Sequence, residues 1–93
     1  MIRSFRDRET ELLAGGERSR NRPPDIQRRA AVLLNRIDAA TSLADLRACH
    51  GSDLKPRPDL GADYHSIRIN DQWRVYFRWN DGDAFDVEVD DKH

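Results

Sequence analysis

Apolar and polar residues alternate through the last third of this sequence. Every second residue is apolar or aromatic in Trp73–Trp79, and the shorter segments Ser66–Ile69 and Phe85–Val89 repeat the pattern. A period of two is typical of β-strands that are buried on one face only. Turn-forming residues, among them the Asp81-Gly82 pair, separate these segments. The pattern therefore predicts three successive antiparallel strands.

A helical period dominates the first half of the chain. Apolar residues recur at helical spacing over 26–40, directly after the stiff Pro23-Pro24 pair that suits the start of a helix. A shorter helix is expected over Asp7–Ala14, ended by Gly15-Gly16. Thr41–Leu46 has the composition of a short helix whose first turn is capped by its own side chains.

These elements predict an α+β fold in one domain that spans residues 1–93. Two N-terminal helices pack on one face of a small, mostly antiparallel sheet, in the order β-α-α-β-β-β with room for a further strand. The first strand is expected at the sheet edge over Met1–Phe5. Residues 48–63 predict a long loop with a short strand near Leu54–Arg57. The other face of the sheet is expected to be open.

Charge is distributed unevenly along the chain. The formal net charge is only -1, but fifteen of the sixteen arginines and lysines precede residue 81. Six of the seventeen acidic residues lie in the short remainder, residues 81–93. A mainly basic body suits a polyanionic partner such as nucleic acid.

Basic residues also gather on the predicted open face. Arg74, Tyr76 and Arg78 share one face of a strand, and Arg68 lies on the strand before it. Guanidinium groups in this arrangement can bind phosphate and stabilise the anion of a transition state. Ordinary cross-strand pairing with acidic residues of the last strand explains the same pattern, and it is the interpretation that the residues alone favour. Phosphate binding is the alternative.

Three groups outside these strands could add to such a site. Lys55 and Arg57, in the long loop, could reach over the open face or remain solvated. His93 stands beside acidic residues that include Asp90 and Asp91, and an imidazole can donate or accept a proton near neutral pH. The carboxylates could orient the imidazole, although acidic tails are commonly just solvated.

The rest of the composition excludes several classes of protein. Cys49 is the only cysteine, so an intrachain disulfide is impossible and a reducing compartment fits. The histidines have no zinc-ligand spacing, and Gly15-Gly16 is not a phosphate-binding glycine loop. No apolar run is long enough to span a membrane, and no signal peptide follows Met1. We therefore expect a cytoplasmic protein with no membrane partner.

Several segments, taken in order, resemble a known family: Met1–Phe5, Asp7–Glu11, Pro23–Ala30, Leu33–Arg47 and Tyr64–Asp83. The sequence is similar to the HigB-type killer proteins, which belong to the RelE/ParE superfamily of type II toxin–antitoxin modules. The resemblance implies a metal-independent, cofactor-free endonuclease that enters a translating ribosome and cuts the messenger. It also implies a HigA-like helix-turn-helix antitoxin as partner. The toxin is then linked to operator DNA only through this antitoxin.

The resemblance also assigns roles to individual positions. Arg74 matches the family arginine that contacts the scissile phosphate, and His93 and Asp91 match a C-terminal motif in which the histidine is a candidate for proton transfer. The family usually has tyrosine where this chain has Lys92, which can neutralise phosphate but cannot stack on a base. The loop before the Ser66-Ile67 strand also differs from the family sequence. Some members have a basic residue just upstream of that loop, and Lys55 is its nearest counterpart here. Phosphate or RNA contacts are expected from Arg68, Tyr76, Arg78, Lys55, Arg57 and Lys92.

Two other functions remain open at this point. The changes at Lys92 and in the loop fit a weakened relative that acts as an antitoxin-binding module and operon co-repressor. The ParE branch of the superfamily offers a gyrase-directed toxin, which the C-terminal motif argues against.

Overall fold

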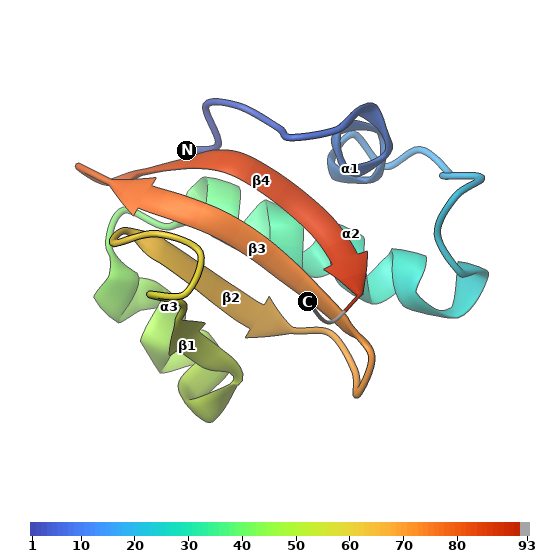
Figure 1. The fold of residues 1–93 in the computed structure, drawn as a ribbon. Coiled ribbons are helices and arrows are strands. Elements are labelled where there is room, and N and C mark those ends of the chain that lie inside the picture. The colour runs from blue at the N-terminus through green and yellow to red at the C-terminus, as the bar shows by residue number, and fades with distance from the viewer. Residues whose placement is uncertain (92–93) are drawn as a thin grey trace.

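The computed structural model describes residues 1–91 and has helices packed against a four-stranded sheet (Figure 1). All neighbouring strands are antiparallel, in the order β1-β2-β3-β4. The α+β prediction is confirmed. The elements are α1 (Arg8–Ala14), α2 (Pro24–Ala39), α3 (Leu43–His50), a 3-10 turn η1 (Gly51–Asp53), β1 (Leu54–Pro56), β2 (Tyr64–Arg68), β3 (Trp73–Asn80) and β4 (Asp83–Asp91).

The core forms between α2 and the sheet. Figure 1 shows α2 running behind β3 and β4, with α1 beside β4 and α3 beside β1. The apolar stripe of α2 is buried, as its helical spacing predicts. It packs in one hydrophobic cluster with the alternating apolar residues of the strands, including Ile67, Val75, Phe77, Val87 and Val89.

The helix boundaries follow local chemistry. Asp7 caps α1 by accepting a hydrogen bond from the Thr10 amide at 2.7 Å, and Pro24 opens α2. Ser42 caps α3 in the same way, accepting from the Asp45 amide. The third helix runs to His50, four residues beyond the predicted end, and occupies the start of the predicted loop.

Two predictions are wrong, one about residues 1–5 and one about the alternation of β4. Residues 1–5 do not form a strand; they make only isolated parallel bridges, Ile2 to Ala84 and Phe5 to Val87. A bulge at Asp86, whose φ is 52°, breaks the alternation of β4. Phe85 therefore stands opposite Arg78, away from the core, and Ala84 takes the buried position opposite Trp79.

The exposed edge of β4 is protected by the N-terminal third of the chain. Backbone hydrogen bonds join residues 1–6 to the first half of β4. Further along, the Val89 amide donates to the buried Thr10 hydroxyl at 2.9 Å, and Arg22 Nε donates to the Val89 carbonyl at 2.8 Å. Side chains thus complete the hydrogen bonding that a fifth strand would supply.

No helix within residues 1–91 combines the length and apolar character needed to cross a membrane.

Candidate nucleic-acid interface

The face of the sheet turned away from α2, called the open face below, carries three rows of residues that follow the strand register. Because neighbouring residues of a strand point to opposite faces, the register decides which side chains share each row. The rows are Arg68, Arg74 and Asp90; Lys55, Ser66, Tyr76 and Glu88; and Tyr64, Arg78 and Phe85.

Two arginines stand directly opposite each other in the first row. Arg68 on β2 pairs in register with Arg74 on β3. Arg68 is ion-paired with Asp71 in the following turn. Within residues 1–91, Arg74 makes no side-chain hydrogen bond or ion pair, although Asp90 lies across from it on β4. Like charges opposite each other destabilise a sheet, so this row favours an anionic ligand near Arg74.

Arg78 is held by acidic neighbours. Its guanidinium lies 3.2 Å from the Asp86 carboxylate and 3.4 Å from that of Asp63. It also lies 6.0 Å from the centroid of the Phe85 ring. The hydrogen bond with Asp86 and the charge of Asp63 raise the pKa of Arg78. Cross-strand pairing with an acidic residue of the last strand is thus correct for Arg78, whereas Arg74 makes no such ion pair within residues 1–91.

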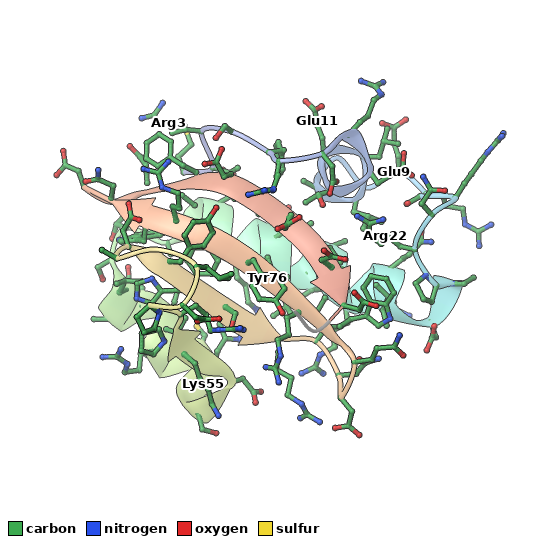
Figure 2. All side chains as sticks on the ribbon, in the orientation of Figure 1. Arg3, Glu9, Glu11, Arg22, Lys55 and Tyr76 are labelled. Carbon is green, nitrogen blue, oxygen red and sulfur yellow. The ribbon has the colours of Figure 1, made fainter. Side chains whose placement is uncertain are left out.

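The loop of residues 57–63 covers the middle of the open face. Arg57 makes a two-pronged ion pair with Asp59, at 3.0 and 3.1 Å, and its guanidinium lies 5.3 Å from the centroid of the Tyr76 ring. The hydrogen bond with Asp59 raises the pKa of Arg57. Figure 2 shows Tyr76 at the centre of this face. Tyr76 is 0% exposed, so the face is not fully open at its centre.

Lys55 is the second basic residue of this face with no ion pair inside residues 1–91. It is exposed on β1 (Figure 2). In the strand register it stands opposite Ser66, one row from Arg74. Ser66 is 1% exposed, and its hydroxyl has no hydrogen-bond partner among the described atoms. Lys55 and Arg74 are thus the basic residues of this face that make no ion pair within residues 1–91.

The end of β4 lies at the Arg74 end of the open face. Asp91 pairs in register with Trp73, and its carbonyl accepts a 3.5 Å hydrogen bond from the Tyr76 hydroxyl. The Asp91 side chain is exposed. His93 and Lys92 lie outside the described residues, so the predictions for them remain predictions.

The other histidines lie away from this face. His65 is half-buried on the core side and stacks on Phe77, with the ring centroids 6.0 Å apart. His50 ends α3, in a groove beside α2. No group of three or more potential metal-binding side chains is assembled within residues 1–91.

Sequence reasoning missed Arg6, Leu60 and Glu88. These residues meet Tyr64 around a small pocket of the open face. Arg6 belongs to the N-terminal segment and Leu60 to the loop, so only the tertiary structure brings them together. The alternation of β4 placed Glu88 on the correct face but gave no sign of a pocket.

Comparison with known proteins identifies the family. Residues 3–93 match the family described as HigB-like toxin, the RelE-like toxin of the type II toxin–antitoxin system HigB. The chain is also 31% identical over 91 residues to Toxin HigB-1 of Vibrio cholerae serotype O1 (strain ATCC 39315 / El Tor Inaba N16961). That match covers 97% of this chain and 96% of the relative. The protein belongs to the HigB-like family of type II toxins, and membership implies an antitoxin partner.

Proposed function

We propose that this toxin is a ribosome-dependent messenger endonuclease whose open face binds the RNA to be cut. The observation that carries the proposal is the Arg68–Arg74 pair, two guanidinium groups opposite each other in register. A phosphate diester bound there would relieve their repulsion and gain charge-assisted hydrogen bonds. Membership in a family of RelE-like toxins supports the same activity.

The chemistry needs a base, an acid and a stabiliser of negative charge. In the proposed step the RNA 2′-hydroxyl loses its proton and attacks the adjacent phosphorus. The bond from phosphorus to the 5′-oxygen of the next nucleotide breaks, and that oxygen receives a proton. Arg74 is proposed to stabilise the charge that builds on the non-bridging oxygens. His93 is proposed for proton transfer, with Asp91 to orient it.

Other basic residues are proposed to bind the RNA backbone. Lys55 and Arg57 flank the loop side of the open face, and Arg68 and Arg78 lie on its strands. Lys92 is proposed to neutralise phosphate where the family usually has tyrosine. We assign Tyr76 a positioning role, because its buried hydroxyl joins the centre of the face to the end of β4.

The proposed partners follow from this activity. The messenger and the ribosome are the targets, so we place the toxin in the cytoplasm. We propose a HigA-like helix-turn-helix antitoxin, which neutralises the toxin and links it to operator DNA. The mechanism assigns no step to a metal ion.

A purified translation reaction tests the proposal. Messenger should be cut inside codons when toxin and ribosomes are both present, and should stay intact when ribosomes are omitted. Addition of the cognate antitoxin should suppress the cuts. Intact messenger on actively translating ribosomes, with folded toxin in excess, would overturn the proposal.

Lys92 favours a second candidate, a weakened relative that acts as an antitoxin-binding co-repressor. A lysine side chain cannot stack on a base as the family tyrosine can. A Lys92→Tyr variant separates the two functions. A toxin that cleaves only after this change supports the co-repressor, whereas equal cleavage by both forms shows that lysine suffices.

A further inference from the structure

A groove of about 520 Å³, called the α2–α3 groove below, lies between α2 and the end of α3. One wall comes from α2, and the other comes from the last residues of α3 together with η1. Because α2 covers the face of the sheet that is turned away from the open face (Figure 1), the groove is separate from the proposed RNA interface. Its volume is in the range of small-molecule binding sites.

Three arginines of α2 line this groove, namely Arg28, Arg29 and Arg36. All three are exposed, and none of them makes a side-chain hydrogen bond or an ion pair within residues 1–91. Arg29 and Arg36 are seven residues apart, so they lie on one side of the helix about 10 Å from each other along its axis. Guanidinium groups that share a groove and have no counter-ion in the chain favour an anionic ligand.

Two aspartates line the same groove without neutralising it. Asp25 belongs to the first turn of α2 and Asp53 to η1, so three arginines against two aspartates leave one excess positive charge. Burial and the charge of Arg36 lower the pKa of His50, which also lines the groove, and Arg29 adds to this shift. Asp53 opposes the shift only partly. The electrostatic potential is therefore positive where α2 meets the end of α3.

An apolar side chain lies between the arginines. Val32 lines the groove and is 43% exposed. It follows Arg29 by three residues and precedes Arg36 by four, so the three side chains share one face of α2. An anion with an apolar part would bury the exposed surface of Val32 as well as meet the guanidinium groups.

We propose that the α2–α3 groove binds a nucleoside diphosphate, with the diphosphate between Arg29 and Arg36 and the nucleoside against Val32. A diphosphate carries the multiple negative charges and acceptor oxygens that paired guanidinium groups bind best. The carboxylates of Asp25 and Asp53 can accept hydrogen bonds from ribose hydroxyls, whereas they repel an extended polyanion such as an RNA strand. This ligand site goes beyond the proposed function and does not depend on it.

Nucleotide titration of the intact protein tests the site. Amide resonances are followed by NMR at constant ionic strength as ADP, AMP, adenosine or pyrophosphate is added. ADP should shift resonances of α2 and α3 around the groove and bind about tenfold more tightly than AMP, which lacks one phosphate. Adenosine should not bind measurably, and pyrophosphate should bind more weakly than ADP.

Three results of this titration would overturn the assignment. Equal affinity for ADP and adenosine would remove the arginines from the site, and pyrophosphate that binds as tightly as ADP would remove the nucleoside. Resonance shifts confined to the open face would place the nucleotide at Arg74 instead.

A matched pair of variants tests the arginines. Arg36→Ala should weaken ADP binding at least about tenfold, because it removes one of the two guanidinium groups at the diphosphate. Arg47→Ala, at an exposed position of α3 that does not line the groove, should leave the affinity within about twofold of wild type. Alanine suits a helix at both positions, so both variants should fold. Equal affinities of the two variants for ADP would contradict the proposal.

Cys49 offers an independent reporter inside the groove. It is the only cysteine of the chain, it is exposed, and it lines the groove. Saturating ADP should slow its alkylation by iodoacetamide at least about threefold, measured by the mass of the intact protein. Adenosine should not slow it, and Arg36→Ala should abolish the protection. An alkylation rate unchanged by ADP would overturn the site, and it would leave the proposed function intact because neither assay involves messenger cleavage.

Discussion

The Arg57 guanidinium lies 5.3 Å from the centroid of the Tyr76 ring, and the two residues join the loop to the middle of the sheet. Arg57 is fixed at its other side by Asp59. The contact covers part of a tyrosine that the strand pattern placed on an open surface. The loop is thus part of the face to which the RNA is proposed to bind.

Arg57→Ala should lower the free energy of unfolding by about 1 kcal/mol, because it removes the stacking on Tyr76 together with a partly exposed ion pair. Urea denaturation followed by tryptophan fluorescence measures the change. Arg47→Ala, at an exposed position of α3, should change stability by less than about 0.5 kcal/mol. Equal losses in the two variants would show that the Arg57 contact does not stabilise the loop.

Thr10→Val should destabilise the protein by about 1–3 kcal/mol. The Thr10 hydroxyl is buried and accepts the Val89 amide, and valine leaves that amide without a partner. The chain offers a matched control in Thr41→Val, because Thr41 is exposed and bonds only locally to Asp45. Denaturant midpoints of the two variants are compared, and a loss at Thr10 no greater than that at Thr41 would contradict the edge-protection account.

The free energy of unfolding should fall as the pH drops below about 6.5, because His50 becomes protonated. Burial, followed by the positive charges of Arg36 and Arg29, lowers the pKa of His50 below its usual value, and Asp53 opposes the shift only partly. The unfolded chain therefore binds the proton more readily, and protonation favours unfolding. The free energy of unfolding, measured between pH 5 and 7.5, gives the slope of stability against pH, which His50→Gln should flatten.

Two aspartates act in a more acidic range. The pKa values of Asp45 and Asp83 are lowered, so their contribution to stability is lost only as the pH falls toward and below 3.8.

Lys55→Ala should weaken RNA binding by the loss of one phosphate contact. The slope of log affinity against log salt should then become shallower by about 0.7, the value for single strands. Fluorescence anisotropy with a short single-stranded RNA at several salt concentrations measures it. Arg28→Ala, on the helix behind the sheet, should leave the slope unchanged, and an equal change for both variants would remove Lys55 from the interface.

Local pattern was enough to predict most of the fold. The helical spacing of α2 and the alternation of β3 each determine one buried face, so the layers follow from the sequence. The Asp81-Gly82 hairpin is also correct: both residues have positive φ, at 52° and 83°.

The errors arise where tertiary contacts decide the structure. A single bulge residue, Asp86, places Phe85 on the opposite face of the sheet from the one its alternation predicts. The sequence pattern of β4 does not indicate this bulge. Residues 1–5 have strand-like composition, but they run beside β4 in only two isolated bridges.

The shared face of the strand arginines was predicted, but their ion pairs were not. The sequence placed Arg68, Arg74 and Arg78 on one face, which the register confirms. It could not show that Arg78 is held by Asp63 and Asp86, because Asp63 comes from the loop. The distinction between a paired and an unpaired arginine depends on side-chain geometry.

The central claim is that Arg74 acts on the scissile phosphate, and single-turnover cleavage of ribosome-bound messenger tests it most directly. Arg74→Ala should lower the cleavage rate at least about 100-fold, the usual effect of removing one transition-state donor. Arg68→Ala, which removes the guanidinium opposite it, should lower the rate less than tenfold. A rate for Arg74→Ala within threefold of wild type, in a variant that still folds and binds ribosomes, would contradict the account.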